Sequence, residues 1–94
     1  MKPYKVIWAL AAEDELIALL DYIEMLYGSL AAVDVLEKVE RTQEQLEQFP
    51  ELYPKSLYHE GLRKAVVSKQ FSLLYVIHLQ EVKVLYVWDN RKSA

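Results

Sequence analysis

Three runs of strand-forming residues between Gly61 and Arg91 are the main indication of this chain's architecture. They read Gly61-Leu-Arg-Lys-Ala-Val-Val67, then Phe71-Ser-Leu-Leu-Tyr-Val-Ile-His78, then Val82-Lys-Val-Leu-Tyr-Val-Trp-Asp-Asn-Arg91. β-Branched and aromatic residues, which favour strands, are dense in all three runs. The breaks between the runs, at residues 68–70 and 80–81, are short enough for hairpins but too short for crossover connections. The stretch therefore predicts three consecutive antiparallel strands.

A fourth strand is predicted near the N-terminus, from Tyr4 to Trp8. Pro3 and Lys5 suit the edge of a sheet, because proline cannot donate to a neighbouring strand and lysine discourages further pairing. The segment from Pro50 to Glu60 is predicted to be a loop, and it is the only connection long enough to form part of a site.

Two amphipathic helices are predicted between the first strand and this loop, from about Leu10 to Tyr27 and from Leu30 to about Gln48. Apolar residues recur in both at steps of three and four, which places them on one helical face. Gly28 is predicted to end the first helix in a left-handed conformation, and Ser29 to be the N-cap of the second. Such a short turn between long helices predicts an antiparallel helical hairpin.

These elements predict an α+β fold, with the helical hairpin packed on one face of a mostly antiparallel four-stranded sheet in the order β-α-α-β-β-β. At 94 residues we expect a single domain, 1–94. The last two strands alternate between two apolar faces. If one face (Phe71, Leu73, Tyr75, Ile77, Val82, Val84, Tyr86, Trp88) meets the helices, the other keeps Leu74, Val76, Leu85 and Val87. Because the helices bury only one face, the second face is predicted to bind a partner.

The composition excludes several classes of function. The chain has no cysteine, so it has no disulfide framework, thiolate metal site or cysteine nucleophile. Its two histidines lack ligand spacing with a pair of carboxylates, and we expect neither a metal nor a cofactor. No apolar run reaches the roughly 18 residues of a membrane span. The N-terminus lacks the long apolar core of a signal peptide. We expect a soluble, cytoplasmic protein without membrane contacts.

The net charge of −3 hides a division between the two parts of the chain. Residues 1–54 carry four Lys or Arg against eleven Asp or Glu, and residues 55–94 carry seven against three. The simplest interpretation is that the acidic residues line solvated helix faces. The basic sheet half favours an anionic partner, although its excess is modest for a nucleic-acid-binding protein.

The ordered set of motifs resembles the RelE/ParE superfamily of type II toxin–antitoxin toxins over essentially the whole chain. The set comprises Tyr4-Lys-Val-Ile-Trp8, Asp21-Tyr-Ile23, Tyr27-Gly28, Phe49-Pro50, Gly61-Leu-Arg63, Phe71-Ser-Leu-Leu-Tyr75 and Val84-Leu-Tyr-Val-Trp-Asp-Asn-Arg91. The resemblance implies a growth-inhibiting toxin that forms a hetero-oligomer with a cognate antitoxin, which contributes a helix or an added strand. The apolar sheet face and the basic half favour an amphipathic, acidic antitoxin segment.

The superfamily implies two activities. RelE-like members cleave messenger RNA on the ribosome, whereas ParE-like members inhibit DNA gyrase by binding it. Arg63 and Arg91 resemble the two sheet arginines of the nucleases, whose guanidinium groups suit phosphate oxygens. Lys55 is a candidate third cation, and His59 is the candidate acid or base in the loop because histidine is the residue type suited to proton transfer at neutral pH. The structural alternative for each arginine is an ion pair with Asp89.

A metal-independent endoribonuclease needs a base, an acid and cations around the phosphate. The sequence after the last predicted strand, Arg91-Lys-Ser-Ala94, lacks the tyrosine or histidine that nuclease members carry there. The long helical hairpin and this incomplete set favour a ParE-like toxin. The alternatives are a RelE-like nuclease and a non-toxic interaction module of the same fold.

Overall fold

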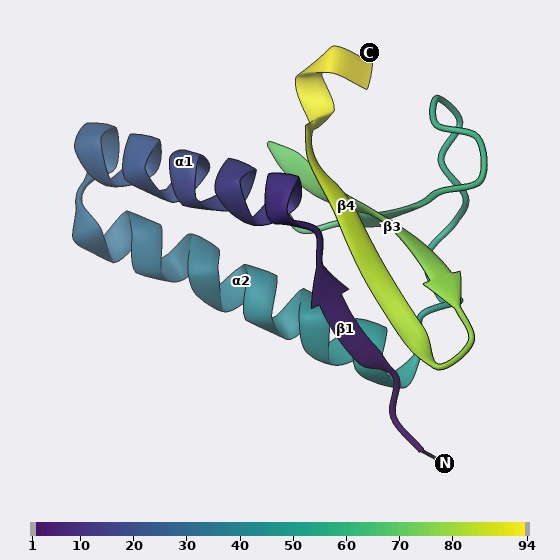
Figure 1. The fold of residues 1–94 in the computed structure, drawn as a ribbon. Helices are drawn as coiled ribbons and strands as arrows, with labels where there is room; N and C mark the ends of the chain where they lie inside the picture. Colours follow the sequence, from purple (N-terminus) through teal and green to yellow (C-terminus); the bar gives the residue numbers. More distant parts are fainter. Residues whose placement is uncertain (1, 94) are drawn as a thin grey trace.

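The computed structural model describes residues 2–93 and has the element order β-α-α-β-β-β (Figure 1). The elements are β1 (Lys5–Trp8), α1 (Leu10–Tyr27), α2 (Ser29–Gln48), β2 (Arg63–Val66), β3 (Phe71–His78), β4 (Glu81–Asp89) and a 3₁₀ turn (Asn90–Ser93). The strands form one sheet in the order β1-β4-β3-β2. β1 runs parallel to β4, and the other neighbours are antiparallel. The predicted fold is therefore confirmed, with β1 at an edge.

The turn of the helical hairpin consists of Gly28 alone. Its φ of 92° lies in the left-handed region that favours glycine, and its N–H donates to the Glu24 carbonyl at 2.9 Å. Ser29 was predicted to be an N-cap, and this is wrong, because Gly28 occupies the cap and Ser29 is the first residue of α2. The Ser29 hydroxyl instead donates to the Glu24 carboxylate at 3.1 Å and ties the two helices together.

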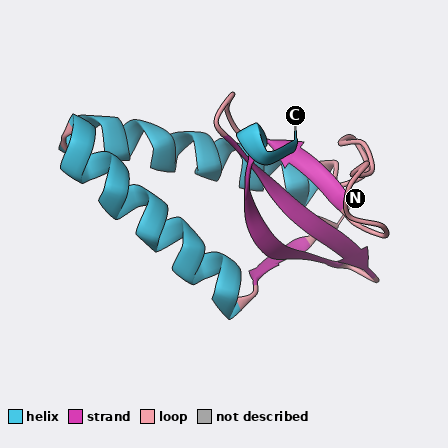
Figure 2. Ribbon diagram, turned by 90° about the horizontal axis from the view of Figure 1, so that it is seen from above, coloured by secondary structure: helices cyan, strands magenta, loops and turns pink. Residues whose placement is uncertain are grey.

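The core lies between the helical hairpin and one face of the sheet (Figure 2). The sheet contributes Leu73, Tyr75, Val82 and Val84, each fully buried, and α2 contributes Leu46. The Tyr75 hydroxyl donates to the buried Pro50 carbonyl at 2.5 Å, which anchors the end of α2 to the middle of the sheet. Burial raises the pKa of this phenol above its ordinary value, so the hydroxyl keeps its proton and remains a donor.

A β-bulge in β4 changes the predicted assignment of the two sheet faces. Leu74 pairs with Tyr86 but Tyr75 pairs with Val84, so Leu85 is an extra residue. Beyond it the side chains exchange faces. Val87 therefore packs against the core, whereas Tyr86 and Trp88 share the far face with Leu74. The predicted placement of Tyr86, Trp88 and Val87 was wrong for this reason.

The predicted open apolar face on the sheet is also wrong. Leu74, its central residue, has no exposed surface, and the His59 ring packs on Trp88 of the same face with ring centroids 4.5 Å apart. More of the exposed large apolar side chains lie on the helical hairpin than on the sheet, and the hairpin tip projects beyond the sheet (Figure 1). Around the tip, Met25 is 75% exposed, Tyr27 72% and Leu30 86%. Within residues 2–93, no helix is both long and apolar enough to cross a membrane.

Candidate functional site

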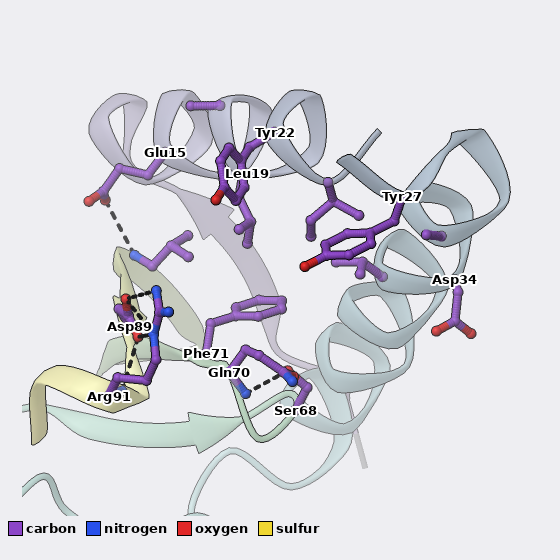
Figure 3. Close-up of a pocket in the computed structure, with 15 residues that line it drawn as sticks. Glu15, Leu19, Tyr22, Tyr27, Asp34, Ser68, Gln70, Phe71, Asp89 and Arg91 are labelled. Atoms are coloured by element: carbon purple, nitrogen blue, oxygen red, sulfur yellow. Dashed lines mark hydrogen bonds and ion pairs between the residues drawn. The ribbon is translucent and has the colours of Figure 1, made fainter. Parts of the chain in front are cut away.

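A groove of about 750 Å³ lies where the projecting hairpin meets the end of the sheet (Figure 3). α1 contributes one wall through Leu19, Tyr22 and Tyr27, and α2 contributes Val35. Phe71 at the start of β3 lies between the sheet and the helices. The groove exists because the helices continue past the strands, which leaves apolar side chains of both helices without a sheet beneath them.

Charged groups stand at the two ends of this apolar groove. At one end the Glu15 carboxylate accepts a hydrogen bond from the Val87 backbone N–H at 3.3 Å, and Asp89 and Arg91 lie nearby. At the other end lies Asp34 on α2 (Figure 3). The groove lining thus contains three carboxylates and one guanidinium group.

Arg91, one of the predicted catalytic cations, lies at the mouth of this groove. Its Nε and Nη2 atoms donate to the two Asp89 carboxylate oxygens at 3.0 and 2.7 Å in a bidentate pair. This hydrogen bond is the main reason that the pKa of Arg91 is raised. The structural alternative considered for Arg91, an ion pair with Asp89, is confirmed. The Arg91 side chain is 83% exposed, so an acidic group of a bound partner can compete with Asp89 for the guanidinium group.

Arg63, the second predicted cation, contacts backbone carbonyls of the segment after α2. It begins the edge strand β2, and its Nη1 donates to the Tyr53 carbonyl at 2.8 Å and to the Glu51 carbonyl at 3.4 Å. The ion pair with Asp89 considered for Arg63 is not formed; its side chain instead fastens the turn after α2 to the sheet. Lys55 is its cross-strand partner through an isolated antiparallel bridge.

His59 lies on the other side of the sheet from Arg63. Its ring stacks edge-on against Trp88 and lies 6.5 Å from the Tyr86 ring, and its Nδ1 is 3.4 Å from the Ser56 hydroxyl. This ring packing holds the later part of the Pro50–Glu60 loop, around His59, on the far face of the sheet. A small crevice of about 340 Å³ beside the ring is shared with Glu15 of α1.

The four predicted catalytic residues therefore do not form one cluster. Arg63 lies opposite Tyr75, whereas Arg91 follows Asp89, which lies opposite Phe71. Four residues along β3 and two strand spacings place the backbones of Arg63 and Asp89, the ion-pair partner of Arg91, about 16 Å apart. The structure brings Lys55 and Arg63 together, but leaves Arg91 and His59 apart from them. In the described part of the chain, no three His, Asp or Glu side chains are placed to hold a metal ion.

Comparison with known protein families identifies the family of this chain. A family model described as the ParE toxin of the type II toxin–antitoxin system parDE matches residues 6–93. The chain belongs to the ParE toxin family. No curated protein sequence gives a significant match.

Solved structures share the ParE fold at low sequence identity. A chain of the chromosomal ParDE TA system from P. aeruginosa superposes with a TM-score of 0.79 at 18% identity, covering 92% of this chain and 95% of that chain. A YoeB/ParE toxin from Agrobacterium tumefaciens gives 0.65 at 13% identity, covering 90% and 96%. A copper-bound mutant toxin from Helicobacter pylori gives 0.58 at 16% identity, covering 95% and 97%. At such identities the likeness shows the fold alone.

Sequence reasoning missed the groove of this ParE-family toxin. Tyr27 belongs to the apolar face predicted for the first helix, yet it is largely exposed in the groove wall. The acidic residues Glu15 and Asp34 were expected to be solvated helix residues. Length gave no signal, because helices of 18 and 20 residues span about 27 and 30 Å, close to the roughly 30 Å of the nine-residue strand β4. The hairpin projects past the sheet because of the direction in which it packs, and that direction is a tertiary feature.

Proposed function

We propose that this ParE-family toxin arrests growth by binding DNA gyrase, and that a cognate antitoxin neutralises it by occupying the groove. The observation that carries the choice of target is the separation of the candidate catalytic groups. Metal-independent RNA cleavage requires cations and an acid–base pair around one phosphate. Here Arg63 is engaged with backbone carbonyls, and Arg91 lies about two strands away beside the groove.

A binding mechanism needs only exposed complementary surface, which the helical hairpin offers. Large apolar side chains at its tip are mostly exposed, and an apolar cluster of this kind marks protein-interaction sites. The groove adjoins the tip through Tyr22 and Tyr27. An antitoxin segment in the groove would therefore cover or flank the tip and block contact with a target.

Induced expression in bacteria tests the target. We expect growth arrest with double-strand DNA breaks and intact messages, and we expect the purified protein to inhibit supercoiling by purified gyrase. Rapid cleavage of messages within codons, with intact DNA, would instead establish the RelE-like alternative. Normal growth under strong expression would leave the non-toxic interaction module as the remaining candidate.

Neutralisation is tested by co-expression with a cognate antitoxin, for which a short open reading frame adjoining the toxin gene would be the candidate source. We expect growth to be restored and the two proteins to co-purify as a hetero-oligomer. An Ala18→Trp substitution places a large ring in the groove at an exposed position, so it is expected to prevent co-purification. Unimpaired co-purification of this variant would show that the antitoxin binds elsewhere.

A further inference from the structure

The groove has the dimensions of a helix-binding site. It is lined on α1 from Glu15 to Tyr27, a distance of about 18 Å at 1.5 Å per residue. A bound helix of about twelve residues, or three turns, matches this length. Leu19, Ile23 and Val35 provide apolar contacts along the groove. An amphipathic helix would present residues at three- and four-residue steps to such a surface.

The charges at the ends of the groove determine which sign of charge a bound segment should carry there. Glu15 accepts one backbone hydrogen bond through Oε1. Among the described residues, Asp34 forms an ion pair with Lys38, four residues further along the same helix, with both side chains about half exposed, and such pairs are weak. Arg91 balances Asp89. The lining therefore carries two more carboxylates than cations, and these two lie at opposite ends (Figure 3).

Aromatic rings strengthen the preference for a cation at the Glu15 end. The small crevice formed by Glu15, His59, Tyr86, Val87, Trp88 and Asp89 shares three of these residues with the groove. A long cationic side chain leaving the groove beside Glu15 would therefore meet the Trp88 and Tyr86 rings. Aromatic faces attract ammonium and guanidinium groups.

We propose that the groove binds an amphipathic α-helix that carries lysine or arginine at both ends of its apolar face. One cation pairs with Glu15 and the other with Asp34, two to three helical turns apart. This inference rests on the proposed function, since it assigns the occupant to the antitoxin, and it reverses the sign expected from the basic sheet half. An acidic helix would bring like charges together at both ends of the groove.

Three fluorescent, stapled helical peptides of about fourteen residues test this inference, because unconstrained helices of that length are marginal in water. They share one apolar face and differ only at the two flanking positions, which hold lysine, glutamine or glutamate. Anisotropy titrations with the full-length protein at low salt are expected to show about tenfold tighter binding of the lysine peptide than of the glutamate peptide. This ratio corresponds to about 1.4 kcal/mol. We expect roughly 0.5 M salt to reduce it.

Variants connect the preference to the named carboxylates. The double variant Glu15→Gln, Asp34→Asn is expected to bind all three peptides within about twofold of one another. The control Glu40→Gln removes the same charge from an exposed residue that does not line the groove, and it is expected to keep the tenfold ratio. Circular dichroism of each variant monitors folding.

Three outcomes would overturn the inference: the glutamate peptide binding as tightly as the lysine peptide, no peptide binding, or unchanged binding to the groove-filling variant Ala18→Trp. Each outcome is separate from the proposed function, which is judged by growth arrest and gyrase inhibition without any peptide. If the protein is toxic but prefers the glutamate peptide, the proposed function stands and only the inferred preference for a cationic helix is wrong.

Discussion

Replacing Arg63 with alanine separates its structural role from a catalytic one. In the structure its guanidinium donates one short bond to the Tyr53 carbonyl, at 2.8 Å, and one long bond to the Glu51 carbonyl, at 3.4 Å. A hydrogen bond from a charged donor contributes about 1.5–3 kcal/mol to stability. Because Arg63 is half-buried and the second bond is long, we expect the lower end of this range, about 1.5 kcal/mol.

Thermal unfolding measures this loss. For a domain of this size, 1 kcal/mol shifts Tm by about 4–8 °C, so Arg63→Ala is expected to lower Tm by about 6–12 °C. Arg63→Lys is expected to recover part of the shift, because an ammonium group keeps one donor but lacks the planar fork. The control Lys64→Ala changes the next residue of β2, whose side chain lies on the opposite face of the sheet, and is expected to leave Tm nearly unchanged.

Growth arrest by the same variants gives the decisive comparison. At a temperature where Arg63→Ala is folded, we expect it to arrest growth as the unmodified protein does. The reasoning would be refuted by a variant with unchanged Tm and no toxicity, because Arg63 would then contribute to the activity and not to the fold.

Three further predictions concern the core and the hairpin turn, and urea unfolding measures all of them. Tyr75→Phe is expected to cost about 1–2 kcal/mol, because it leaves the buried Pro50 carbonyl without its donor. Burial raises the pKa of Tyr75 above its ordinary value of 10.0, so the unfolded chain loses this proton first. Stability is therefore expected to fall as the pH rises above about 10, and Tyr75→Phe to weaken that fall. Leu73→Ala is expected to cost about 2–5 kcal/mol because Leu73 is fully buried, whereas Leu57→Ala, at a residue 93% exposed, should change little. Gly28→Ala is expected to cost about 1–2 kcal/mol, since φ is 92° there; an unchanged midpoint would mean that the turn relaxes.

The positions of the two arginines show that the groove and the β2 edge of the sheet are separate surfaces. Arg91 is part of the groove and pairs with Asp89, whereas Arg63 lies at the far edge of the sheet, beyond β3. A helix bound in the groove would contact the first and not the second. Antitoxin binding and any event at the β2 edge are therefore separable by mutation, which makes the growth assay of Arg63 variants independent of the peptide titrations.

Local patterns were sufficient to predict the elements of this protein and their order. Helical periodicity and the glycine at position 28 predicted a hairpin whose first helix, Leu10–Tyr27, has the observed bounds. Dense β-branched runs with short breaks predicted three antiparallel strands. These features depend on residues close together in the chain, so they can be read without tertiary contacts.

Only the tertiary structure decided which side chains meet. The extra residue Leu85 became a bulge because β4 pairs with β3 in a particular register, and that register moved Tyr86 and Trp88 away from the core. Arg63 and Arg91 looked equivalent in the sequence, as arginines in or next to strands. In the structure Arg63 donates to the Tyr53 carbonyl after α2, whereas Arg91 pairs with Asp89. The groove arises because the helical hairpin packs in a direction that carries its tip past the sheet (Figure 1). Such contacts join residues distant in sequence. A one-residue shift in strand pairing moves every later side chain of the strand to the opposite face of the sheet, and so changes which residues it contacts.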